Sequence, residues 1–487
     1  MSNNSLKKEL TVGVFYTAIA KYGAIVVSLV VTAILARLLS PEDFGVVAIS
    51  TIIINFFGMF SELGIGPAII QNQQLSKSNL SSIFSFTVYL GIAMGGLFFF
   101  CAEPVASYYE NPKLEPICRI LSVCIFFASL SIVPNALIYK EKKFKLIAQR
   151  TIVIQFVGGM ISVIGALNGM GIYSLLINPI LANAGLFVVS FYYKPQRFRF
   201  RFEVSVLKLI YHFSVYQFLF NVINYFSRNL DKLMIGKHIG MSPLGYYEKS
   251  YRLMMLPLQN ITQVITPVMH PIFAQFQNDL KQLSLNYLKI VKLMSFIGFP
   301  LSVFLFFAAK EVILITFGDQ WLDAVPVFRI LSLSVAVQII LSSSGSMFQA
   351  ANATRAMFLS GLLSSIVNIG GLFIAIFWYK TLESVAWALV ITFTFNFFQC
   401  YWILFCRIFK QKLSLFFKTL ISPVIISVLI GVVLYVCEMF IAELSIVVSL
   451  IVKGTIYMLM LGLYIQIRKE YDLIGIIKCK LIGKKTE

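Results

Sequence analysis

The stretch FSVYQFLFNVINYFSRNLDKLMIGKHIG, residues 213–240, is apolar enough to cross a membrane and yet carries a row of polar side chains. These polar residues are spaced by four, three, four and three positions, which places them on one face of a helix. They are Gln217, Asn221, Asn224, Arg228 and Asp231. A bilayer tolerates such a face only where it meets protein or a water-filled cavity. The stretch therefore predicts a membrane-spanning helix that lines a polar passage.

The whole chain has the composition of a protein that crosses the membrane many times. Of its 487 residues, 59% are hydrophobic and only 13% are charged, far from the balance of a soluble domain. A helix needs roughly 20 apolar residues to span a hydrocarbon core of about 30 Å. The sequence predicts fourteen such segments, at residues 13–36, 44–66, 80–102, 116–138, 147–167, 171–192, 209–234, 245–269, 287–309, 325–349, 356–378, 383–405, 415–437 and 445–467. The expected fold class is therefore an all-α polytopic membrane protein.

The sequence repeats itself at an offset of 200 residues. RLLSPEDFGVV joins the first two predicted spans, KHIGMSPLGYY joins the seventh and eighth, and Gly45 aligns with Gly245. Six spans in each half give both halves the same orientation, as in transporters built from parallel repeats. We expect four parts: helices 1 to 6 over residues 1–205, helices 7 to 12 over 206–410, two further helices over 411–468 and a cytoplasmic amphipathic tail over 469–487.

The net charge of +19 is explained by membrane topology. With a cytoplasmic N-terminus, Lys and Arg gather in loops on the cytoplasmic side, whereas the outer loops hold only Lys113, Lys237 and Lys380, and the remaining basic residues lie within helices or at their rims. We therefore expect both termini in the cytoplasm. Because the basic residues are scattered over separate loops, the charge argues against a nucleic-acid partner. The 7 cysteines and 3 histidines show no metal-binding spacing, so no metal site is expected.

Polar stripes on corresponding helices of the two halves predict one shared cavity between the halves. Its expected cations outnumber its acids, which suits a diphosphate, and its amides suit sugar hydroxyls. The candidate substrate-binding residues are Lys21, Asn221, Asn224, Tyr225, Arg228, Lys232, Lys249, Arg252 and Gln259. The candidate residues for coupling to an ion gradient are Glu62, Asp231 and Glu248.

The charged candidates also have structural interpretations that the sequence leaves open. Arg228 and Asp231 stand three residues apart and are spaced for a local ion pair. Lys21 has the reach to extend its ammonium group toward the cytoplasm, and Glu62 stands where it would cap the end of helix 2. A contact with substrate and a structural pairing are compatible for these side chains.

Three segments make the chain resemble a known family. LARLLSPEDFGVVAIS, SELGIGPAIIQ and DKLMIGKHIGMSPLGYYEKSYRLMMLP are similar to the polysaccharide-transporter branch of the multidrug/oligosaccharidyl-lipid/polysaccharide exporter superfamily. Within it the chain most resembles the Wzx-type flippases of the colanic-acid-exporter kind. That group often has Asp-Leu-Gly at the end of helix 2, where this chain has Glu62-Leu63-Gly64.

The resemblance implies a fold like that of the MATE and MurJ transporters and a location in the bacterial inner membrane. It implies that an undecaprenyl-diphosphate-linked oligosaccharide is moved to the outer leaflet for O-antigen, exopolysaccharide or capsule assembly, with a polymerase and export machinery as further partners. Alternating access would move the load without an enzymatic step. The sequence has no GxxxxGK[ST] loop for a nucleotide, which leaves a proton gradient, a sodium gradient or the membrane potential as the driving force.

Two other functions remain open. A multidrug or cation antiporter of the MATE type would share the twelve-helix core, but its cavity would be acidic or apolar. A membrane polymerase or ligase acting on the same lipid-linked sugars would need an outer catalytic domain. Every predicted outer loop is only about a dozen residues or shorter, which argues against the enzyme.

Overall fold

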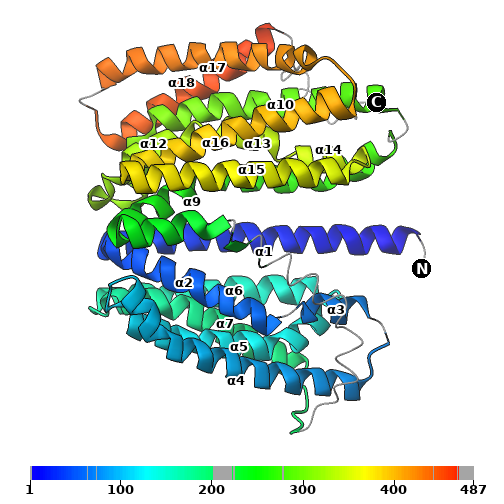
Figure 1. Cartoon of the computed structure of the whole chain (residues 1–487), viewed down its shortest axis with the longest axis vertical. Helices are drawn as coiled ribbons and strands as arrows, with labels where there is room; N and C mark the ends of the chain where they lie inside the picture. The colour runs from blue at the N-terminus through cyan, green and yellow to red at the C-terminus, as the bar shows by residue number, and fades with distance from the viewer. Residues whose placement is uncertain are drawn as a thin grey trace. The chain divides into compact units, whose positions relative to one another are not determined.

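The computed structural model describes residues 3–62, 64–72, 74–200, 222, 225–226, 228–276, 279–441, 444–468 and 470. Their regular structure is helical throughout, without a strand (Figure 1). The chain divides into two compact units, Met1–Gly245 and Tyr246–Glu487. The boundary expected near residue 205 falls outside the described residues.

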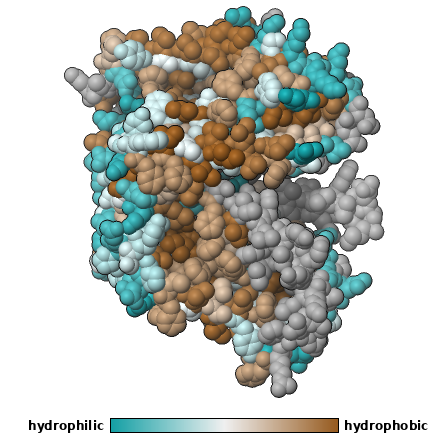
Figure 2. Space-filling view, viewed as in Figure 1, coloured by the Kyte–Doolittle hydropathy of each residue, from teal (hydrophilic) through white to brown (hydrophobic). Residues whose placement is uncertain are grey.

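Within the described residues, eleven helices are long and apolar enough to cross a membrane, or twelve if the bent pair Ala324–Ser332 and Val335–Ala350 forms one span. Among the residues coloured in Figure 2, hydrophobic ones fill most of the middle of the view, and hydrophilic ones lie mainly along its left edge and at its upper right. The prediction of an all-α polytopic membrane protein is confirmed. The count of fourteen stays a prediction, because the span expected at 209–234 lies largely outside the described residues and the one at 245–269 is not among the eleven.

The first unit is built around its fifth helix. Its elements are α1 (Asn3–Leu38), α2 (Pro41–Glu62), α3 (Ile65–Gln71), α4 (Lys77–Tyr108), α5 (Leu114–Lys140), α6 (Phe144–Leu167), η1 (Gly171–Tyr173), α7 (Ser174–Tyr193) and the start of α9 (Met241–Ala274). Helix α5 packs against α2, α3, α4 and α7, while α1 packs against α6. Ile69, Ile83, Phe84 and Val133 form a buried apolar core around α5. These contacts hold α2 and α7 on either side of α5.

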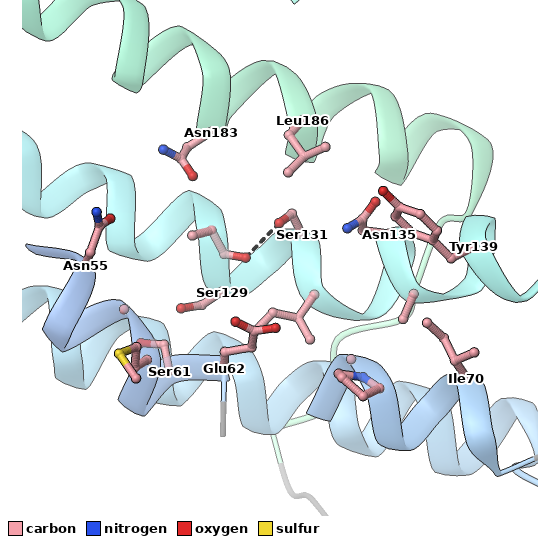
Figure 3. A pocket seen from close by; sticks show the side chains of 17 residues that line it. Asn55, Ser61, Glu62, Ile70, Ser129, Ser131, Asn135, Tyr139, Asn183 and Leu186 are labelled. Carbon is pink, nitrogen blue, oxygen red and sulfur yellow. Dashed lines mark hydrogen bonds between the residues drawn. The ribbon is translucent and has the colours of Figure 1, made fainter. Parts of the chain in front are cut away.

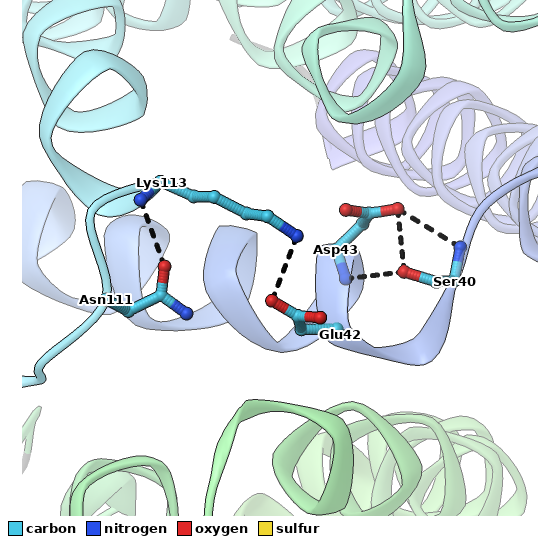
Figure 4. A network of polar contacts seen from close by, with 5 residues as sticks. All are labelled: Ser40, Glu42, Asp43, Asn111 and Lys113. Atoms are coloured by element: carbon cyan, nitrogen blue, oxygen red, sulfur yellow. Dashed lines mark hydrogen bonds and ion pairs between the residues drawn. The ribbon is translucent and has the colours of Figure 1, made fainter.

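A capping box fixes the start of α2 (Figure 4). The Ser40 hydroxyl accepts a hydrogen bond from the Asp43 backbone N–H at 3.3 Å, and the Asp43 carboxylate accepts one from the Ser40 backbone N–H at 3.1 Å. Pro41 suits the first helical position because that residue needs no N–H donor there. Lys113 lies across from this turn, with its Nζ 3.0 Å from Glu42 Oε1. The sequence SPED therefore encodes both the beginning of α2 and its link to the segment before α5.

The starts of α2 and α9 touch through two glycines that the sequence repeat aligns. A Cβ atom on Gly45 would lie 1.9 Å from the Met241 carbonyl oxygen, and one on Gly245 would lie 2.0 Å from the Pro41 carbonyl oxygen. Only glycine permits so close an approach of two backbones. A few residues earlier, Lys237 pairs with Glu110 at 2.7 Å.

The second unit is organised around α10. Its elements are the rest of α9, α10 (Leu280–Phe307), α11 (Ala309–Phe317), η2 (Asp319–Trp321), α12 (Ala324–Ser332), α13 (Val335–Leu341), α14 (Ser344–Ala350), α15 (Thr354–Ile374), η3 (Ala375–Tyr379), α16 (Leu382–Trp402), η4 (Ile403–Ile408), α17 (Leu413–Ile441) and α18 (Ile446–Ile467). Helix α10 packs against α12, α13, α17 and α18. Phe296, Ile426, Ile430 and Leu434 form the buried contact between α10 and α17.

A buried ion pair ties α18 to the beginning of α11. Lys453 Nζ lies 2.6 Å from Glu311 Oε1, and both side chains are almost fully buried. The Ser449 hydroxyl donates to the same carboxylate oxygen at 2.6 Å, and Lys453 also donates to the Phe307 carbonyl at 2.8 Å. Moving a charge out of water costs free energy of desolvation, and these bonds offset that cost for Lys453 and Glu311.

Candidate functional site

A polar cavity of about 490 Å³ lies inside the first unit, between α2, α3, α5 and α7 (Figure 3). We call it the α2–α5–α7 cavity. Its polar lining residues are Asn55, Ser61, Glu62, Ser129, Ser131, Asn135, Tyr139 and Asn183. Its apolar lining is Met59, Pro67, Ile70, Ala128, Ile132, Ala136 and Leu186, together with Gly58 and Gly66. Such a volume falls within the roughly 300–1,000 Å³ typical of small-molecule sites.

Glu62 reaches the cavity because the chain turns sharply after it. It is the last residue of α2, and Gly64 adopts a left-handed conformation with φ +70° before α3 begins at Ile65. Glycine is the residue that takes this conformation without a steric cost. The Glu62 side chain points from α2 toward α5 (Figure 3). None of the ion pairs formed by the described residues involves it.

The hydroxyl and amide groups of the lining have defined orientations. The Ser129 hydroxyl donates to the Ile125 carbonyl, and the Ser131 hydroxyl donates to the Ala128 carbonyl, both within α5. Because each hydroxyl hydrogen is already used, the two oxygens can only accept hydrogen bonds from a bound molecule. The Asn183 amide nitrogen donates to the Pro179 carbonyl at 2.9 Å, which leaves its oxygen as an acceptor. The cavity therefore contains several hydrogen-bond acceptors beside the Glu62 carboxylate.

Arg150 orients one donor of the cavity from behind its wall. Its guanidinium donates to Asn135 Oδ1 and, at 2.7 Å, to the Ser190 hydroxyl, and the residue is 5% exposed. With its oxygen engaged, Asn135 keeps its NH₂ group as a donor for the cavity. The structure buries Arg150 in α6, where it holds Asn135 and α7.

Ser61 is a buried hydroxyl at the cavity. It is 2% exposed, and its oxygen has no hydrogen-bond partner among the residues that the structure describes. A buried hydroxyl without a partner is costly. No lysine or arginine is among the residues that line the cavity, so its charge character is acidic to neutral.

The other candidates in the first unit are only partly covered by the structure. Lys21 is half-buried on α1, Arg228 is exposed and Asp231 is buried. Tyr225 donates its hydroxyl to the Ile52 carbonyl at 2.7 Å, which anchors it to α2. Lys232 is half-buried. Outside the described residues lie Gln217, Asn221 and Asn224. The ion pair between Arg228 and Asp231 stays a prediction.

In the second unit the candidates lie on α9. Lys249 is buried and pairs with the neighbouring Glu248 at 3.1 Å. Arg252 is half-buried, and Gln259 is exposed. The Tyr247 ring is fully buried and stacks on another tyrosine of α9, so it offers no face to a sugar. The binding roles of the α9 polar residues stay a prediction.

The comparisons with known proteins identify the family. Residues 34–326 match the family described as "Polysaccharide biosynthesis protein". The chain belongs to this family. That result confirms the polysaccharide-transporter branch that the motifs after the first and seventh spans predicted.

Relatives of this family member match along most of its length. It is 23% identical over 435 residues to the teichuronic acid biosynthesis protein TuaB of Bacillus subtilis, covering 88% of this chain and 89% of that protein. It is 26% identical over 349 residues to the lipopolysaccharide biosynthesis protein WzxC of Escherichia coli, covering 71% of each. Its fold matches that of the lipid II flippase MurJ in an inward closed conformation, with a TM-score of 0.70, 15% identity, and coverage of 95% of this chain and 100% of that one.

Proposed function

We propose that this multi-pass membrane protein is a flippase that moves an undecaprenyl-diphosphate-linked oligosaccharide from the cytoplasmic to the outer leaflet of a bacterial inner membrane. The family and the MurJ-like fold support a transporter rather than an enzyme. TuaB and WzxC are named for the biosynthesis of surface polymers, which agrees with such a load. The observation that carries the proposal is the match of residues 34–326 to the family described as a polysaccharide biosynthesis protein.

The load has two chemically different parts, and the candidates divide accordingly. A diphosphate is held best by cations, and sugars by groups that donate and accept hydrogen bonds. We assign the diphosphate to Lys21, Arg228, Lys232, Lys249 and Arg252. We assign contacts with the sugars to Asn221, Asn224, Tyr225 and Gln259.

Transport then proceeds by alternating access without breaking a bond. The polar head of the lipid occupies a polar passage while its tail remains in the bilayer, because hydrocarbon gains nothing by leaving the lipid phase. A proton, a sodium ion or the membrane potential drives the cycle through Glu62, Asp231 or Glu248. Both termini face the cytoplasm, and a polysaccharide polymerase receives the product outside.

Charge substitutions in Lys21 and Arg252 test the proposal. Two unit charges about 4 Å apart attract by roughly 4 kcal/mol at an effective dielectric constant near 20, so losing one cation should weaken diphosphate binding strongly. Lys21→Gln and Arg252→Gln should lose most transport, whereas Lys21→Arg should keep it. The measurement is the appearance of lipid-linked oligosaccharide in the outer leaflet, with protein abundance checked by immunoblot.

Normal transport by both glutamine variants would show that these cations do not hold the load. If cells lacking the protein accumulated no lipid-linked oligosaccharide but became sensitive to cationic drugs, the flippase proposal itself would fail. That result would favour a multidrug antiporter.

A further inference from the structure

We propose that the α2–α5–α7 cavity is a saccharide subsite, which holds a sugar ring of the lipid-linked load while its diphosphate is bound elsewhere. This inference rests on the proposed function and assigns a substrate part to a cavity whose lining on α5 and α7 was not recognised from the sequence, although Glu62 on α2 was a candidate. Asn135 and Asn183, which line it on α5 and α7, lie on helices that carried no predicted site residue.

The lining groups match the hydroxyl groups of a sugar, each of which both donates and accepts. The Asn135 NH₂ group, oriented by Arg150, is a donor. The Asn183 oxygen and the hydroxyl oxygens of Ser129 and Ser131 are acceptors. Tyr139 and the apolar lining offer surfaces to the C–H faces of a ring. The geometry thus supplies both kinds of partner around one space.

The Glu62 carboxylate decides between a sugar and a phosphate. An ionised carboxylate only accepts hydrogen bonds, so it favours hydroxyl donors and repels another anion. No lysine or arginine lines the cavity to offset that repulsion. Arg150 lies behind the wall with its terminal nitrogens bonded to Asn135 and Ser190. A diphosphate is therefore disfavoured here, whereas two sugar hydroxyls on one carboxylate form charge-assisted hydrogen bonds.

Ser61 provides an independent observation. Its hydroxyl is 2% exposed and has no partner among the described residues, yet it lines the cavity. Buried hydroxyls in proteins normally have a partner. A sugar hydroxyl in the cavity would supply it, which explains why a serine rather than an alanine stands at this position.

Binding of two lipids to the full-length protein in lipid nanodiscs tests the inference. One probe is the lipid-linked oligosaccharide isolated from cells that lack this transporter. The other is synthetic undecaprenyl diphosphate, which carries no sugar. The variants are Glu62→Gln and Ser61→Ala, with Glu103→Gln as the matched control, because Glu103 is an exposed carboxylate on α4 that does not line the cavity.

We expect the wild type and Glu103→Gln to bind the oligosaccharide lipid more tightly than undecaprenyl diphosphate. Glu62→Gln should lower affinity for the oligosaccharide lipid about 10- to 100-fold, and Ser61→Ala about 3- to 10-fold, as expected for one charge-assisted and one neutral hydrogen bond. Neither should change the affinity for undecaprenyl diphosphate. Ser61→Ala should also fold at least as stably as the wild type, because it loses no bond within the protein.

Three results would overturn the inference. The first is an undiminished preference for the oligosaccharide lipid in both variants. The second is an equal loss of affinity for both lipids, which would mean that the changes act on the diphosphate or on folding. The third is a Glu62→Gln variant that keeps its sugar preference but loses the dependence of transport on a proton gradient, because Glu62 would then be a proton site. Failure of the wild type to bind either lipid would instead reject the flippase proposal, and the subsite with it.

Discussion

Replacing Gly45 by alanine should break the contact between the starts of α2 and α9. The added methyl carbon would lie 1.9 Å from the Met241 carbonyl oxygen and 2.7 Å from its carbonyl carbon. Non-bonded heavy atoms prefer separations of roughly 3.5–4.0 Å, so the two backbones would have to move apart by more than about 1 Å. Gly245→Ala meets the same obstacle at Pro41, where the separation is 2.0 Å.

The cost should be large because the obstructing atoms belong to the backbone. A side chain could rotate away, but a carbonyl at the start of a helix moves only with its helix. Overpacking typically costs about 1–3 kcal/mol, and we expect each alanine to reach about 3 kcal/mol. The double variant Gly45→Ala/Gly245→Ala should cost less than the sum, because the first methyl already separates the segments that the second would touch.

Thermal unfolding of the detergent-purified protein, followed by size-exclusion chromatography, measures this effect. Gly96→Ala is the matched control, since Gly96 lies within α4 and nothing approaches its Cβ position within 4 Å. Replacing a helical glycine by alanine there should be neutral or stabilise by up to about 1 kcal/mol. If Gly45→Ala melted at the same temperature as Gly96→Ala, the close backbone contact would not exist in the protein.

Three further predictions concern charges and topology. Lys453→Met should lower the free energy of unfolding by about 3–5 kcal/mol, because Glu311 then keeps a buried charge without its partner. Adding Glu311→Leu to that variant should restore most of the lost melting temperature. The hydrogen bond from Lys237 lowers the pKa of Glu110 below its ordinary 4.5. The ion pair should therefore persist above pH 4.5 and be lost on further acidification, when Glu110 takes up a proton. At such acidic pH the melting temperatures of the wild type and of Glu110→Gln should converge. A cysteine at Lys142 should react with an impermeant thiol reagent only in permeabilised cells; labelling in intact cells would invert the topology.

The apolar segments of the sequence predicted where helices lie, but they did not predict where a helix is broken. The segment expected as one span at 325–349 is broken into α12, α13 and α14, with a bend of 45°. The hydroxyls of Ser332, Ser334, Ser342 and Ser343 donate to carbonyls three residues earlier in the same segment. Such local bonds compete with the helical pattern and bend helices. Hydropathy does not register that competition, because a few serines barely change the mean of a long apolar stretch.

The sequence revealed only those site residues that share a helix face. The row on residues 217–231 is visible because helical spacing is a pattern within one segment. Arg150, Asn135 and Asn183 each stand on a different helix, and their common site arises only when α5, α6 and α7 pack. One signal was available: each is a strongly polar residue inside an otherwise apolar span, which a membrane protein keeps only for a packing or binding reason.

Glu62 was visible from the sequence, but its surroundings are known only from the structure. Its charge within an apolar span made it a candidate from the sequence, and the structure places it at the C-terminal end of α2. A helix C-terminus carries partial negative charge, which disfavours a carboxylate by roughly 0.3–1 kcal/mol. No cation of the described residues pairs with it. An acid in this position therefore weakens the fold slightly, and a purely structural role does not explain it. Donors brought by a bound sugar would offset the cost, which is why the glutamine variant should be the more stable protein and the poorer binder.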